Sequence, residues 1–184
     1  MKHLLLALGM VLLPRTLAFA EEPITEKNWQ THPRVREVRA IQSAISQGVK
    51  RGRYRRATRQ FDVEAEVQGC KGLYPVLRKA AYRDAQGRVA LYHVDQVSFD
   101  DELVRFDYFY DTHGTLRFYL QDRVLSAVRV YFDKDGKHFL TVDSMSAPEL
   151  QVSTEETWEV GLHTAADALD AFRSAEPCPE NRKR

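Results

Sequence analysis

A short motif recurs three times in the middle of the chain and limits the fold more than any other feature. Each copy follows the pattern (Tyr/Phe)-x-Asp-x-x-Gly, with turn residues Asp84–Gly87, Asp111–Gly114 and Asp133–Gly136. An Asp side chain accepts hydrogen bonds from the backbone of its own turn, and Gly readily takes the positive φ that closes a short hairpin loop. The motif therefore predicts three β-hairpins.

The segments between these turns alternate apolar and polar residues, which is the period of a half-buried β-strand. The pattern is clear over residues 104–110, 116–120, 126–132 and 138–142. Residues 61–67 show it too, with Asp62, Glu64 and Glu66 forming a wholly acidic outer face. Hairpins that follow one another in this way predict an antiparallel meander over residues 61–143.

A helix is expected on each side of the meander. In residues 33–50, apolar residues recur every three or four positions, with Thr31 as the expected N-cap and Pro33 in the first turn. Thr164–Asp167 is typical of a capped helix start, and this short helix should end near Ala175. The predicted fold class is α+β: an antiparallel β-meander of about six to seven strands, an N-terminal helix packed on it and a short C-terminal helix.

Residues 1–20 have the pattern of a secretory signal peptide. Lys2 gives a positive start, Leu4–Leu13 is apolar, and Ala18–Ala20 forms an Ala-x-Ala cleavage site. A short core helix or a membrane anchor are the alternatives, but ten residues cannot span roughly 30 Å of hydrocarbon. We predict cleavage after Ala20, a periplasmic or secreted location without a lipid anchor, and no membrane span in residues 21–184, which form a single globular domain.

Cys70 and Cys178 are the only cysteines. In an oxidising compartment such a pair is expected to form one disulfide. The bond would tie the C-terminal tail, within residues 144–184, to the region before the first long strand. Closing a loop of about 100 residues stabilises a protein by up to ~4.7 kcal/mol in the chain-entropy model.

Charge is distributed unevenly along the chain. Residues 33–60 carry nine Lys or Arg against one Glu, whereas residues 61–184 carry 15 basic and 22 acidic side chains. The basic connector over residues 51–60 is a candidate site for an anionic ligand. Its candidate contacts are Arg51, Arg53, Arg55, Arg56 and Arg59. The alternative is that these arginines neutralise the acidic sheet or are merely solvated. Nucleic acid is not an expected partner, because Tyr54 is the only aromatic residue within the cluster.

Tyrosines are dense in the meander and suggest a second candidate site. Because strand residues alternate between the two faces of a sheet, they cannot all be buried if helices cover only one face. Tyr92, Tyr119 and Tyr131 are the candidates for an exposed aromatic face that binds a protein or a glycan. Cross-strand aromatic pairs that only stabilise the sheet are the alternative.

Motifs of known chemistry do not emerge from the sequence. It has no Gly-x-Ser-x-Gly elbow and no phosphate-binding glycine loop. Asp133–Gly136 opens like a calcium loop, but Ser144 stands where that loop needs a Glu, so a hairpin turn is the better interpretation. We therefore expect no catalytic residue, no cofactor and no metal.

The helix, the basic connector and the repeated hairpins together resemble uncharacterised secreted proteins of Gram-negative bacteria, over about Val35 to Val142. The resemblance implies this fold and export, and it lends no activity. The expected function is a non-enzymatic binding module of the bacterial envelope, whose partner is a protein, a glycan or an anionic polymer. The alternatives are a secreted inhibitor of a foreign enzyme and an envelope hydrolase that uses Asp or Glu.

Overall fold

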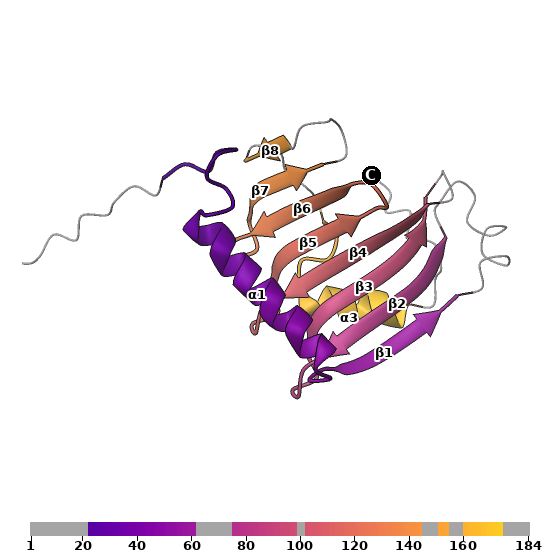
Figure 1. Cartoon of the computed structure of the whole chain (residues 1–184). Coiled ribbons are helices and arrows are strands. Elements are labelled where there is room, and N and C mark those ends of the chain that lie inside the picture. Colours follow the sequence, from indigo (N-terminus) through magenta and orange to yellow (C-terminus); the bar gives the residue numbers. More distant parts are fainter. Residues whose placement is uncertain (1–21, 62–74, 99–101, 145–150, 155–159, 175–184) are drawn as a thin grey trace, which may run out of the picture.

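The computed structural model describes residues 22–61, 75–98, 102–144, 151–154 and 160–174. Its centre is an eight-stranded antiparallel sheet in which each strand pairs with the next one in sequence (Figure 1). In order, the strands are β1 (Arg55–Gln60), β2 (Val76–Arg83), β3 (Val89–Val97), β4 (Leu103–Tyr110), β5 (Leu116–Asp122), β6 (Ala127–Phe132), β7 (His138–Asp143) and β8 (Gln151–Ser153). The predicted α+β meander is confirmed, with more strands than the six or seven expected.

The first strand, β1, lies in a segment that was expected to be a connector. Most of the predicted connector over residues 51–60 is β1, because its backbone pairs with β2 from Arg55 to Gln60. The predicted strand over residues 61–67 lies, apart from Phe61, outside the described residues. The short β8 forms the other edge of the sheet, next to β7.

The three predicted hairpin turns are confirmed in detail. In the first, Asp84 Oδ1 accepts hydrogen bonds from the backbone N–H of Gln86 and of Arg88, both at 2.9 Å. Asp111 and Asp133 accept the equivalent pairs of bonds in their turns. Each motif glycine has a positive φ, between 75° and 82°. Because the turns follow β2, β4 and β6, all three lie at the same end of the sheet.

The predicted N-terminal helix is α1 (Pro33–Lys50), which packs across β4, β5 and β6. Its apolar stripe, including Val35, Val38 and Ile45, is buried with Trp29 against one face of the sheet. The expected cap was wrong: His32 is the N-cap residue and its side chain makes no capping bond. The Thr31 hydroxyl instead donates to the carbonyl oxygen of Asn28 at 3.0 Å.

The C-terminal helix α3 (Ala165–Arg173) lies on the opposite face, against β2 and β3 (Figure 1). Its predicted cap is confirmed, because Thr164 and Asp167 form a reciprocal capping box. The backbone N–H of Ala165 donates to the carbonyl oxygen of Gly114 at 2.8 Å, which fixes the start of the helix to the β4–β5 turn. The sheet is thus covered by a helix on each face and has two separate apolar cores. No helix in the described part of the chain is long and apolar enough to cross a membrane.

Candidate functional site

The predicted anion-binding arginines lie at one edge of the sheet. We call Arg51, Arg53, Arg55, Arg56 and Arg59 the basic edge. Arg51 and Arg53 are exposed in the turn between α1 and β1, and β1 itself is the outermost strand (Figure 1). Two further cations lie in register on β2, since Arg55 pairs with Arg83 and Arg59 with Lys79. Like charges directly opposite each other in a sheet are destabilising.

Aromatic rings support two of these arginines. The guanidinium of Arg56 lies 5.7 Å from the ring centroid of Tyr82, and that of Arg59 lies 5.5 Å from the ring centroid of Phe172. Such contacts orient a guanidinium group without neutralising its charge. Within the described ranges, none of the five arginines makes an ion pair. Of the predicted alternatives, pairing with the acidic face formed by Asp62, Glu64 and Glu66 lies outside those ranges. Simple solvation fits the exposure of Arg51, Arg53, Arg55 and Arg56.

The predicted aromatic face is wrong, because all three tyrosines are buried. Tyr92, Tyr119 and Tyr131 are 2%, 6% and 0% exposed. Tyr92 and Tyr119 belong to the core beneath α3, whereas Tyr131 belongs to the core beneath α1. Two helices on opposite faces therefore cover aromatic residues that a single helix would leave open. The predicted alternative of cross-strand aromatic contacts fits better, since the Tyr108 and Tyr119 ring centroids are 5.1 Å apart on β4 and β5.

Sequence reasoning missed a charged network on β2, β3 and β4. His93 Nδ1 lies 2.6 Å from Asp107 Oδ1, and Arg78 pairs with Asp95. Arg78 Nη2 also lies 3.3 Å from His93 Nε2; since a guanidinium can only donate, Nε2 accepts this bond and Nδ1 carries the proton to Asp107. Asp95 Oδ1 is then left buried without a hydrogen bond, although it lies 2.9 Å from Nε2.

Arg105 Nε lies 3.9 Å from Asp95 Oδ1 and adds a second positive charge, so two arginines balance the two aspartates, and both nitrogens of His93 face protein groups. It is therefore poorly placed to take a proton from a substrate. One signal in the sequence could have revealed this network: His93 and Asp107 are each seven residues from Asp100, which begins the polar run Asp100–Glu102 between two apolar segments. Equal distances from a hairpin turn place two residues opposite each other, as the observed register confirms.

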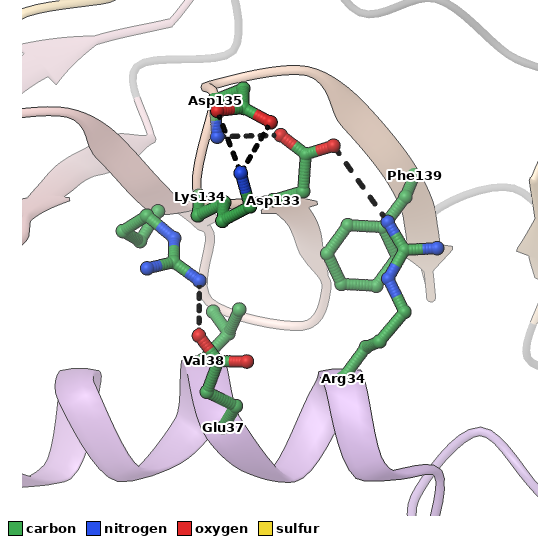
Figure 2. A pocket seen from close by; sticks show the side chains of 8 residues that line it. Arg34, Glu37, Val38, Asp133, Lys134, Asp135 and Phe139 are labelled. Atoms are coloured by element: carbon green, nitrogen blue, oxygen red, sulfur yellow. Dashed lines mark hydrogen bonds and ion pairs between the residues drawn. The ribbon is translucent and has the colours of Figure 1, made fainter. Parts of the chain in front are cut away.

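A polar cavity lies between α1 and the β6–β7 turn, with a volume of about 440 Å³ (Figure 2). We call it the turn cavity. Most of its lining side chains are charged: Arg34, Glu37, Val38, Arg117, Asp133, Lys134, Asp135 and Phe139. Figure 2 shows the Arg34 guanidinium lying over the ring of Phe139, 4.2 Å from its centroid. Arg34 Nη2 also approaches Asp133 Oδ2, at 3.9 Å.

A second cavity adjoins the first and shares Arg34, Asp133 and Phe139 with it. We call it the N-terminal cavity, because its other walls come from the residues before α1 and from the strand β7. Its volume is about 490 Å³, and its lining includes residues 22–24, His32, Lys137, His138 and Thr154. The sequence did not indicate either cavity, because the residues of α1 and of the β6–β7 turn are about a hundred positions apart.

Two other predictions, the disulfide and the signal peptide, are not tested by the described residues. Cys70 and Cys178 both lie outside them, as does the predicted signal peptide over residues 1–20. Comparison of the chain with protein-family models, curated proteins and solved structures finds no match. The functional argument therefore depends on the geometry of the chain itself.

Proposed function

We propose that this protein is an exported, non-enzymatic binding module that holds an anionic polymer on its basic edge. The observation that supports this proposal is the concentration of positive charge on β1 and on the turn before it. Five arginines lie there, and Arg83 lies in register with Arg55 on β2. Lys79, in register with Arg59, is buried and its Nζ donates to the carbonyl oxygen of Ala171 at 3.2 Å. The predicted signal peptide supports export.

The energetics of the edge favour a ligand. Cations directly opposite one another raise the energy of the free protein, and a bound anion would relieve that repulsion. Arginine is suited to this role because its planar guanidinium binds phosphate and carboxylate groups in a bidentate manner. The supporting rings of Tyr82 and Phe172 hold two of the guanidinium groups in place.

The layout of the edge favours a polymer over a single small anion. A strand rises by about 3.3 Å per residue, so Arg55 and Arg59 are separated by roughly 13 Å along β1. No single phosphate reaches across that distance. A chain with regularly repeated charges can contact several arginines at once and gains affinity from each contact.

Protection of the sheet edge is a competing explanation, because charged side chains also prevent edge strands from pairing with other molecules. The two explanations predict different results when charge is removed. A protective edge, once neutralised, increases aggregation and leaves ligand binding unchanged. A binding edge, once neutralised, loses affinity for polyanions.

The test measures binding of the mature chain to inorganic polyphosphate over a series of salt concentrations, with neutral dextran as the negative control. Arg53→Ala combined with Arg55→Ala removes two exposed edge charges. The matched control is Lys27→Ala with Arg36→Ala, which removes two exposed charges elsewhere. We expect the edge variant to reduce the slope of log affinity against log salt by about two, or about one per lost phosphate contact.

The control pair should change binding little, because charges away from the ligand are screened beyond about 8–10 Å at physiological salt. Equal losses in both pairs would show that only net charge matters and would contradict a defined site. Failure of the wild-type protein to bind polyphosphate at low salt would also reject the proposal.

A further inference from the structure

The N-terminal cavity lies against the start of α1. His32, the N-cap residue, and Arg34, the second residue of the helix, both line it. No side chain caps this helix, and its first turn contains no acidic residue. The first backbone N–H groups of a helix carry a positive partial charge, so a carboxylate is favoured at this position.

His32 supplies an independent sign of a missing partner. Its side chain is almost fully buried, with 4% exposed. Nε2 lies 2.9 Å from the carbonyl oxygen of Glu22; because a carbonyl can only accept, Nε2 is the donor. In the neutral ring Nδ1 is then an acceptor, and it is buried without a hydrogen bond. A ligand that donates an N–H to Nδ1 would satisfy it.

The charges around the cavity are of both signs. Arg34 and Lys137 are positive, and Asp133 and Glu22 are negative. Glu22 Oε1 accepts a hydrogen bond from Asn28 Nδ2 at 3.1 Å. Asp133 Oδ1 is occupied by two backbone N–H groups of its own turn. Asp133 Oδ2 has only the 3.9 Å approach to Arg34, which is too long for a hydrogen bond. Both the guanidinium and this carboxylate oxygen therefore retain capacity for a ligand.

We infer that the N-terminal cavity binds a small zwitterion of amino-acid or dipeptide size, which carries one carboxylate and one amine. The carboxylate contacts the Arg34 side chain and the backbone N–H of Arg34, which is the first N–H of α1 because Pro33 has none, with Lys137 adding positive charge. The amine donates to His32 Nδ1 and to Asp133 Oδ2. A volume of about 490 Å³ suits a ligand of this size. This site is separate from the basic edge, so either proposal can fail without the other.

The experiment is calorimetric titration of the mature chain with three matched probes. L-alanyl-L-alanine has both charged ends, its N-acetyl derivative lacks the amine, and its C-terminal amide lacks the carboxylate. We expect the free dipeptide to bind about tenfold or more tightly than either blocked form, because each blocked end loses a charge-assisted hydrogen bond. Glucose serves as an uncharged polar probe and should not bind.

Three variants locate the site. Arg34→Gln should weaken dipeptide binding by about tenfold or more, since it removes the charge that receives the carboxylate. His32→Phe keeps a planar ring but removes both ring nitrogens, including the Nδ1 acceptor, so it should selectively reduce the advantage of the free amine. Lys134→Ala is the control, because Lys134 lines only the turn cavity and pairs with its neighbour Asp135. Thermal melting confirms that each variant is folded.

Several outcomes would overturn the inference. Equal binding of the free and the N-acetylated dipeptide would indicate a simple anion site. Binding of glucose in preference to the dipeptide would indicate a saccharide site. The third outcome is that the dipeptide does not bind even at about 10 mM, a concentration well above the Kd of an ordinary small-ligand site. This result would indicate that the cavity holds no zwitterion.

Discussion

Arg117 fastens α1 to the sheet, and its removal is the most informative test of the fold. The residue is 5% exposed in β5. Its Nη2 donates to Glu37 Oε1 of α1 at 2.6 Å, and its Nη1 donates to Asp111 Oδ2 of the β4–β5 turn at 3.4 Å. Its Nε donates to the carbonyl oxygen of Phe132 at 3.3 Å. One side chain thus connects a helix, a turn and a neighbouring strand.

The magnitude follows from the burial of each partner. The side chain of Glu37 is 61% exposed, so its ion pair contributes only about 0–1 kcal/mol. The side chain of Asp111 is 11% exposed, and breaking a buried pair by removing one partner destabilises by about 3–5 kcal/mol. Arg117→Met keeps most of the apolar stem, so we expect a loss of about 3 kcal/mol. Glu37→Gln, the matched control, should lose less than about 1 kcal/mol.

Urea denaturation measures both free energies of unfolding, and the m-value checks that unfolding stays two-state. For a chain of this length, a loss of about 3 kcal/mol corresponds to a Tm lower by roughly 6–12 °C. If Arg117→Met is no more destabilising than Glu37→Gln, the buried contacts to Asp111 and Phe132 contribute nothing, and the reasoning is refuted.

Three further predictions concern a turn, the buried tyrosines and the cysteines. Gly87→Ala should destabilise by about 1–2 kcal/mol, the penalty of a left-handed backbone alone, since nothing lies within 4 Å of the added Cβ. Gly114→Ala should cost more in the same denaturation assay, because its Cβ would approach the Cβ of Ala165 to 3.3 Å; equal losses would contradict this. Desolvation raises the tyrosine pKa at five positions, so their stabilising effect is complete below about pH 10 and is lost as pH rises towards the folded-state values. Absorbance titration should therefore show delayed tyrosinate formation in the folded protein relative to the urea-unfolded chain, and coincident curves would argue against it. The five positions are Tyr92, Tyr108, Tyr110, Tyr119 and Tyr131. Intact-mass analysis after alkylation of the unreduced, denatured protein should detect no free thiol on Cys70 or Cys178, and two alkylated thiols would disprove the disulfide.

The hairpins and the helices could be predicted because they depend on local residues. An Asp and a Gly three positions later are enough to define a turn, and the apolar period of residues 33–50 is enough to define a helix. The strand β1 was not predicted, because five of its six residues are polar and only Ala57 is apolar. Its strand conformation comes from pairing with β2, which no local pattern records.

The candidate sites were harder, since they depend on which face each helix covers. Strand alternation places Tyr131 and Tyr119 on opposite faces of the sheet. It does not reveal that α1 covers one of these faces and α3 the other. The positive charge of the basic edge was visible in the sequence as a cluster of arginines. The N-terminal cavity was not, because His32 and Asp133 meet only after α1 has packed on the finished sheet.

The strictly sequential order of the strands has a consequence for how the chain folds. Each strand finds its partner nearby along the chain, so the sheet can grow hairpin by hairpin with a modest loss of loop entropy at each step. In contrast, α1 must reach β4, β5 and β6, which lie more than fifty residues further along. We therefore expect α1 to dock late, so that core substitutions such as Val38→Ala mainly speed unfolding, whereas substitutions in the central hairpins slow folding.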